Sequence, residues 1–169
     1  VLGNYETWSG STSWDLALSD EGITVLNNEA MRISIDGQEI CIRGLGDAYT
    51  NQIRSTQFPV SCANLPKITF THDPAGAFSK SVKGIVFAAH THCGQLKLPI
   101  LGSLWIPSKA PEDATCGLYQ DASIWLWVTS GVGTSILPIR IGTQSQWDLF
   151  EIFESLHTFT STFWNDVRF

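Results

Sequence analysis

Three of the four histidines stand where two strands of the chain are expected to end. His72 follows the run 68–71, and the pair His90 and His92 follows the apolar run 84–88. Side chains at i and i+2 of an extended segment project to the same side, so this pair can reach one metal centre or two adjacent ones. Imidazole nitrogen is a common ligand of divalent transition metals. Two loop histidines that bond only to backbone carbonyls are the alternative interpretation.

Asn4 adds an oxygen donor of a kind that metal centres accept. It stands in the opening segment Gly3-Asn4-Tyr5-Glu6. An amide oxygen is neutral, so it can bind a divalent ion without adding charge. We therefore expect Asn4, His72 and His90 to form one face of a metal site, with His92 turned toward a second ion.

The segments that must position these side chains have mainly the pattern of strands. Short apolar runs, alternating or rich in β-branched residues, are separated by Gly and Pro, and Asp36-Gly37 is a strong hairpin-turn signal. Loops at the carboxyl ends of strands are where a layered α/β sheet places its chemistry. We expect an α/β (α+β) fold with strands over 31–35, 40–42, 68–71, 84–88, 124–128 and 139–141, and helices over 11–18 and 74–79.

Length and charge narrow the class of protein. The 169 residues suit one domain, and 10 Lys and Arg against 16 Asp and Glu give a net charge of −6. Nucleic-acid binding requires clustered cations, so we expect no nucleic-acid partner. Hydrophobic residues make up 43% of the chain, too many for disorder, and they are too interrupted for a membrane span. A cytoplasmic location or one at the periphery of the inner membrane agrees with this.

The cysteines and the first residues carry two further expectations. Cys41, Cys62, Cys93 and Cys116 form no Cys-x-x-Cys pair, so we expect mostly buried thiols. The opening at Val1 has no signal-peptide pattern and resembles the middle of a domain.

Motif order identifies a family resemblance. Gly3-Asn4-Tyr5-Glu6, His72 and Ala89-His90-Thr91-His92 resemble the calcineurin-like metallophosphoesterase superfamily, in which Gly-Asn-His-Asp/Glu, a strand-ending His and Gly-His-x-His occur in this order. Four flanking runs are similar to the YkuE/YaeI-like branch, and the resemblance extends to about Glu151. Those runs are 22–29, 44–47, 90–99 and 130–140.

The resemblance implies a fold and a reaction. The fold would be the later half of a β-sandwich flanked by helices, with a partial metallophosphoesterase domain over 1–153 and a C-terminal tail over 154–169. The reaction would be hydrolysis of a phosphodiester or pyrophosphate, in which a hydroxide bridging two divalent ions attacks phosphorus in line. Manganese is the expected metal, with iron and zinc as alternatives.

The resemblance also assigns roles to individual residues. Asn4, His72 and His90 would ligate the second metal and His92 the first. Tyr5 occupies the place of the family histidine that assists the leaving group, and Glu6 the place of the carboxylate that orients it. Gln95 and Arg140 would contact substrate, with plain surface roles as the alternative.

Three departures limit the expected activity. The family's Asp-x-His and bridging Gly-Asp have no counterpart before Val1, so we expect this isolated chain to bind metal poorly and to be inactive. A phenol is a poor proton shuttle near neutral pH, so Tyr5 could slow catalysis, with Glu6 bonding its hydroxyl. Ala89 and Cys93 replace family glycines. A catalytically degenerate binding module of the same fold is the alternative function.

Apolar segments raise the question of a lipid-linked substrate. The branch is associated with cleaving the pyrophosphate of UDP-2,3-diacylglucosamine in lipid A synthesis, whose acyl chains require apolar surface. Core packing or a docking tail is the alternative to peripheral membrane contact. The residues concerned are Leu96, Leu98, Ile100, Leu101, Leu104, Trp105, Ile106, Phe150, Phe153, Leu156, Phe163 and Trp164.

Overall fold

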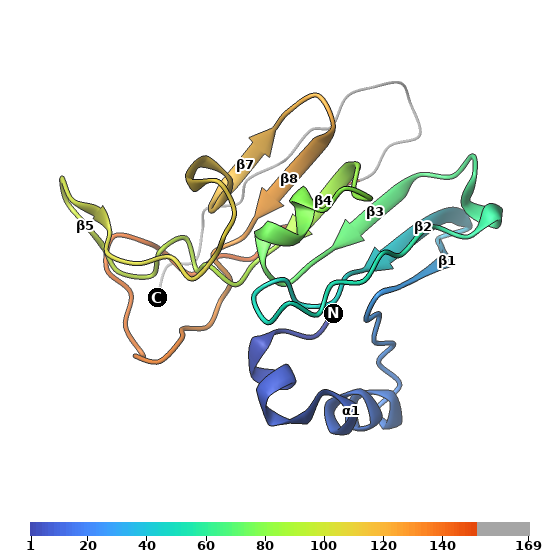
Figure 1. The fold of residues 1–169 in the computed structure, drawn as a ribbon, viewed down its shortest axis with the longest axis horizontal. Coiled ribbons are helices and arrows are strands. Elements are labelled where there is room, and N and C mark those ends of the chain that lie inside the picture. Colours follow the sequence, from blue (N-terminus) through green and yellow to red (C-terminus); the bar gives the residue numbers. More distant parts are fainter. Residues whose placement is uncertain (152–169) are drawn as a thin grey trace.

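A six-stranded mixed sheet forms the centre of the computed structural model, which describes residues 1–151 (Figure 1). The strand order is β1-β2-β3-β4-β8-β7; β2, β3, β4 and β8 run parallel, and the edge strands β1 and β7 pair antiparallel. The strands are β1 (Glu29–Ile35), β2 (Gln38–Gly44), β3 (Lys67–Phe70), β4 (Gly84–Ala88), β7 (Gly117–Gln120) and β8 (Ile124–Val128). The predicted mixed α/β class is confirmed.

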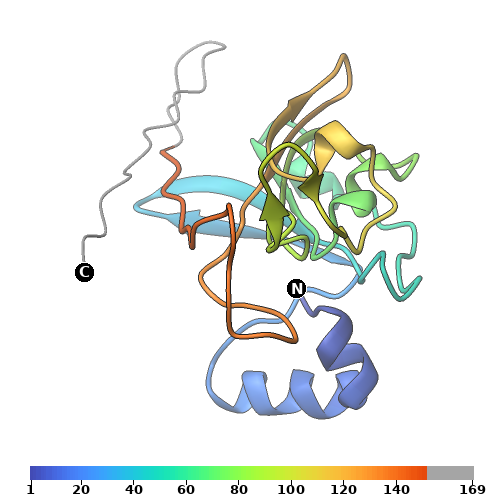
Figure 2. The ribbon, with the colours of Figure 1, turned by 90° about the vertical axis from the view of Figure 1, so that its left-hand side faces the viewer.

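The other elements lie around this sheet. The kinked helix α1 (Asn4–Asp20) lies beyond one end of the strands in both views (Figure 1, Figure 2). A second, two-stranded sheet pairs β5 (Lys97–Leu98) with β6 (Gly102–Ser103). Short 3-10 helices complete the order: η1 (Val60–Cys62), η2 (Pro74–Phe78) and η3 (Glu112–Ala114).

The Asp36-Gly37 hairpin turn is confirmed. Both residues have positive φ, 51° and 81°, as the common two-residue hairpin turn requires. The turn sets the register Ile35↔Gln38 between β1 and β2.

The core lies on one face of the parallel strands. Val86 of β4 and Leu126 of β8 are fully buried there, and Ala88 and Val128, two residues further along the same strands, lie on the same face. Because side chains alternate across a sheet, Phe87 and Trp127 point to the other face, where Phe150 packs against both rings. Burial of a side chain such as Leu126 contributes about 1.5–3 kcal/mol. This packing holds the ends of β4 and β8 rigidly.

Several local expectations need correction. No strand forms over 139–141: Ile139 is exposed, Pro138 lacks a backbone N–H, and only Ile141 makes an isolated bridge, with Leu96. The helix predicted over 11–18 is the second part of α1, which begins at Asn4 and bends at Gly10 (φ 106°). The segment predicted as a helix over 74–79 is the short 3-10 helix η2.

The prediction of free buried thiols is wrong. Cys41 is bonded to Cys62 and Cys93 to Cys116, and the described residues contain no free cysteine. The pairs are 21 and 23 residues apart, separations that carry no recognisable spacing signal, so only the fold brings them together.

Two sequence expectations fall partly outside the described residues. The boundary between 153 and 154, the tail over 154–169 and the residues Phe153, Leu156, Phe163 and Trp164 all lie there. Within residues 1–151 no helix has the length and apolar character needed to cross a membrane.

Candidate metal centre

Parallel pairing of β3 and β4 places two histidines side by side. Phe70 of β3 is the register partner of Phe87 of β4, and both strands end in the same direction. His72 and His90 follow these ends, and the Ala89 N–H donates to the His72 carbonyl (3.0 Å). The expectation that each histidine follows a buried strand is therefore confirmed.

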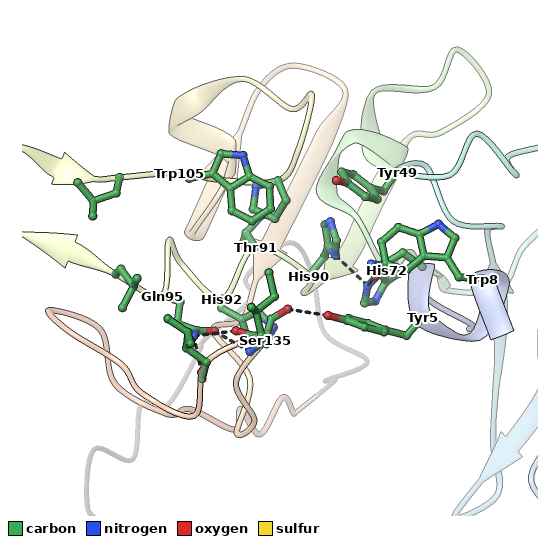
Figure 3. Close-up of a pocket in the computed structure, with 16 residues that line it drawn as sticks. Tyr5, Trp8, Tyr49, His72, His90, Thr91, His92, Gln95, Trp105 and Ser135 are labelled. Carbon is green, nitrogen blue, oxygen red and sulfur yellow. Dashed lines mark hydrogen bonds between the residues drawn. The ribbon is translucent and has the colours of Figure 1, made fainter.

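Asn4, His72 and His90 form what we call the three-donor cluster. The His72 Nε2 atom lies 3.0 Å from Asn4 Oδ1 and 3.0 Å from His90 Nδ1, and the two imidazole centroids are 4.6 Å apart (Figure 3). Asn4 is buried in the first turn of α1, and His90 is also buried. Residues from three separate segments thus converge on one point.

The chemistry of the three-donor cluster suits a divalent cation. Burial, followed by the neighbouring His90, lowers the pKa of His72, which favours the neutral ring whose lone pair a metal requires. His72 Nε2 carries at most one proton but faces two polar atoms, and His90 Nε2 is buried without a hydrogen-bond partner. No set of three His, Cys, Asp or Glu side chains in residues 1–151 is arranged for a metal, and the third donor of this cluster is the amide oxygen of Asn4.

Gly3 explains why a glycine precedes Asn4. A Cβ at this position would lie 2.7 Å from the His72 Cε1 and Nε2 atoms. Any side chain would therefore displace the ring or α1. The close approach of backbone to imidazole lets α1 bring Asn4 to His72.

His92 has a different environment from His90. The loop is not extended: φ is 60° at His90 and 49° at His92, so the expectation that i and i+2 project to the same side does not apply. His92 Nδ1 lies 3.3 Å from the Ser130 carbonyl oxygen and 3.3 Å from Arg140 Nη2. Burial first, and then the Arg140 charge, lower the pKa of His92. The lowered pKa favours the neutral ring, which faces a cation.

Arg140 holds the loop 131–142 together. Its Nη2 donates to the carbonyls of Ser130 (2.7 Å), Gly131 (3.0 Å) and Gly133, and Nη1 donates to the His92 carbonyl (3.3 Å). Burial lowers the pKa of Arg140 from its usual value. Its contact with substrate stays a prediction, because the guanidinium here bonds to backbone.

Gln95, like Arg140, bonds to the backbone of the loop 131–142. Its Nε2 donates to the carbonyls of Ser135 (3.0 Å) and Leu137 (2.9 Å), and its Oε1 accepts from the Ser135 N–H (2.7 Å). Both ends of the amide therefore bind the same loop. Gln95 also lines the cavity beside the histidines, and a role in binding substrate stays a prediction.

Tyr5 and Glu6 do not contact each other as expected. The Tyr5 hydroxyl lies 3.3 Å from Ser135 Oγ, and the ring is half exposed at the cavity (Figure 3). Glu6 Oε2 accepts from the Gly3 N–H (2.8 Å), which satisfies a free donor at the start of α1. The suggested Glu6 bond to the Tyr5 hydroxyl is therefore wrong, because helix capping uses that carboxylate.

A cavity of about 390 Å³ lies beside the histidines. Tyr5 and Trp8 of α1 stand on one side and Trp105 on the other (Figure 3). The remaining lining is mostly apolar and comes from the segments after β4 and β8: Leu96, Leu104, Pro107, Ile136 and Leu137. A polar reacting group would thus lie at the imidazoles with apolar surface around it.

Sequence reasoning missed two aromatic residues at this site. The Tyr49 ring packs at 4.8 Å from the His90 ring, and Trp8 contacts Tyr49 edge-on at 6.1 Å. They lie in different segments with no shared motif, so only the fold could identify them.

Three curated proteins match the chain. Phosphodiesterase YaeI of Escherichia coli is 30% identical over 159 residues, 89% of this chain and 56% of that protein. The uncharacterized metallophosphoesterase YkuE of Bacillus subtilis is 27% identical over 158 residues (90% and 54%). The putative metallophosphoesterase F40B5.2 of Caenorhabditis elegans is 29% identical over 163 residues (83% and 32%).

The matches cover most of this chain but only part of each relative. This chain spans about half the length of the first two relatives. No protein-family model matches it, and no solved structure matches it significantly. The three relatives nevertheless agree in name, since each is called a phosphodiesterase or a metallophosphoesterase. These matches, over 83% to 90% of this chain, support its assignment to a metallophosphoesterase family.

Proposed function

We propose that the protein is a metal-dependent phosphoesterase that hydrolyses a phosphodiester or pyrophosphate beside the three-donor cluster. The observation that carries this proposal is the convergence of Asn4, His72 and His90, with both contacts at 3.0 Å, on the wall of a cavity. Bound divalent cations neutralise charge on phosphoryl oxygens and lower the pKa of water. Manganese is the proposed metal, with iron and zinc as alternatives.

The chain's own residues would divide the work. Asn4, His72 and His90 would hold one ion. His92 would hold a second through Nε2, since its Nδ1 faces Ser130 and Arg140. The apolar walls would exclude water around the reacting group.

Hydrolysis of bis(p-nitrophenyl) phosphate tests the proposal. In a protein that also carries the family's upstream Asp-x-His and Gly-Asp ligands, we expect manganese-dependent turnover that His72→Ala abolishes and that the exposed-residue control Lys83→Ala leaves unchanged. Turnover that survives removal of all divalent metal would contradict the proposal. Metal binding without any turnover would favour a catalytically degenerate binding module.

Tyr5 offers a test of leaving-group protonation. A positioned general acid typically contributes 10²- to 10⁴-fold, and a phenol is a weaker proton shuttle than imidazole at neutral pH. The Tyr5 hydroxyl faces the cavity beside Ser135. We expect Tyr5→His to raise turnover; an unchanged rate would show that protonation of the leaving group does not limit it.

We further propose that the substrate carries an acyl group, with UDP-2,3-diacylglucosamine as a candidate from lipid A synthesis. Support comes from the apolar wall, where Leu104 is 58%, Trp105 61% and Ile136 80% exposed. Such exposed side chains suit an acyl chain or peripheral contact with a bilayer. We expect Trp105→Ala to raise KM for an acylated diphosphate but not for its deacylated form. Vesicle sedimentation that shows no lipid dependence would contradict membrane contact.

A further inference from the structure

The Cys93–Cys116 disulfide lies directly beside the proposed metal ligands. Cys93 follows His92 in the chain, and its Cα lies 4.8 Å from that of Cys116. Cys116 immediately precedes β7, whose residue Gly117 pairs with Val128 of the buried strand β8. The bond therefore fastens the histidine loop to the edge of the central sheet.

The histidine loop needs such a restraint. His90, His92 and Cys93 have φ values of 60°, 49° and 53°, which residues with a side chain rarely adopt. Backbone of this kind persists only where surrounding structure holds it. Three residues of one four-residue turn thus depend on contacts outside it.

A hydrogen bond supplies the second contact. The buried Thr91 hydroxyl donates to the Thr115 carbonyl (2.7 Å) and also lies 3.3 Å from the Cys93 N–H, which donates to it. Thr115 is the residue before Cys116. The disulfide and this bond therefore join the same two segments at adjacent positions.

The two disulfides differ in their access to solvent. Cys41 and Cys62 are each 0% exposed, whereas Cys116 is exposed and Cys93 is 7% exposed. Thiol–disulfide exchange depends on access of the attacking thiolate to a sulfur. A soluble dithiol should reach the Cys93–Cys116 bond first.

We propose that the Cys93–Cys116 disulfide is a redox-sensitive clamp that positions His90 and His92 for metal binding. A dithiol transfers two electrons and two protons, so that the Sγ–Sγ bond breaks, two cysteine thiols form and the dithiol becomes a disulfide. The released loop leaves its left-handed conformation and the imidazoles lose their alignment. The metal part of this proposal rests on the proposed function, whereas the loop restraint does not.

Graded reduction with dithiothreitol, followed by thiol alkylation and mass spectrometry, tests the accessibility. We expect Cys93 and Cys116 to be alkylated about tenfold faster than Cys41 and Cys62, because access governs exchange. Equal rates, or the opposite order, would overturn the redox sensitivity.

Hydrogen exchange and manganese titration test the clamp itself. We compare the oxidised chain, the selectively reduced chain and Cys93→Ser/Cys116→Ser, with Cys41→Ala/Cys62→Ala as the matched control. Manganese is the probe because freed thiols prefer softer metals. Loss of the disulfide should speed hydrogen exchange of the amides of residues 90–94. It should also weaken manganese binding about 10- to 100-fold, the range typical when a contact that supports a metal ligand is lost. Neither change should occur in the control.

The two readouts separate the possible failures. Unchanged exchange over 90–94 after reduction would overturn the clamp, and faster exchange with unchanged manganese affinity would overturn its role in positioning the ligands. Weak manganese binding by the oxidised chain is expected without the family's upstream ligands. Complete absence of measurable binding would overturn the proposed metal centre, and the exchange data would still decide the clamp.

Discussion

His90 and His92 stand two residues apart in one loop but in opposite electrostatic surroundings. His90 belongs to the three-donor cluster, where its Nδ1 lies 3.0 Å from His72 Nε2. His92 instead meets the guanidinium of Arg140 at 3.3 Å. The same residue type therefore lies beside another imidazole at one position and beside a guanidinium two residues later. The neighbours that the fold supplies decide the difference, which the spacing of the motif does not show.

The largest expected effect is loss of the three-donor cluster. We expect His72→Ala to weaken binding of the manganese ion at the three-donor cluster about 100-fold or more, because it removes the ring that contacts both other donors. His92→Ala should weaken it less. Isothermal titration calorimetry measures both, and a larger effect from His92→Ala would reverse the comparison.

Crowding at Gly3 should disturb the three-donor cluster without removing a donor. Gly3→Ala places a Cβ 2.7 Å from the His72 ring, so we expect about 1–3 kcal/mol less stability and about tenfold weaker manganese binding. Gly133→Ala is the matched control, since a Cβ there meets nothing within 4 Å. Urea unfolding and calorimetry give the two quantities. Equal effects from both substitutions would contradict the assigned role of Gly3.

Removal of the Arg140 charge should change the surroundings of His92. Arg140→Gln leaves loop carbonyls without their donor, so we expect about 1–3 kcal/mol less stability. It also removes the second cause of the lowered His92 pKa, so that pKa should rise, as an NMR titration would show. Arg140→Lys keeps the charge but not the planar fork. It should lose stability while changing the His92 pKa less.

Acidification should lower the stability of the fold through both His72 and His92, by less than the substitutions above. The pKa values of folded His72 and His92 lie below the ordinary value of 6.5, so the unfolded chain binds more protons. The free energy of unfolding of the metal-free chain should therefore be constant above about pH 6.5 and fall as the pH decreases below it. Urea unfolding across pH 5–8 measures this. Stability that rises on acidification would contradict the lowered pKa values.

Sequence patterns predicted the parts of the site that follow strand ends. β4 and β8 have the predicted bounds, and the positions of His72 and His90 follow from parallel pairing, which brings strand ends to one edge. The grouping of Asn4 with His72 rested on the donor chemistry of its amide and on motif order within a family, because α1 is distant in sequence from β3.

Other parts could not be predicted for identifiable physical reasons. The left-handed backbone at His90 and His92 is a conformation that residues with a side chain rarely adopt. The expectation that an extended segment points both rings to the same side was therefore wrong. Arg140 and Gln95 resemble substrate ligands by type, but their bonds to loop carbonyls depend on where the chain returns after β8. Both disulfides depend on long-range proximity.

The enclosed Cys41–Cys62 bond has a consequence for biosynthesis. It joins β2 to η1, and neither sulfur-bearing residue has solvent exposure in the finished fold. An oxidant or isomerase therefore reaches these sulfur atoms only when the structure around them opens. We expect the bond to form fastest before β2 and η1 have packed together, so oxidation that precedes complete folding should favour the native pairing.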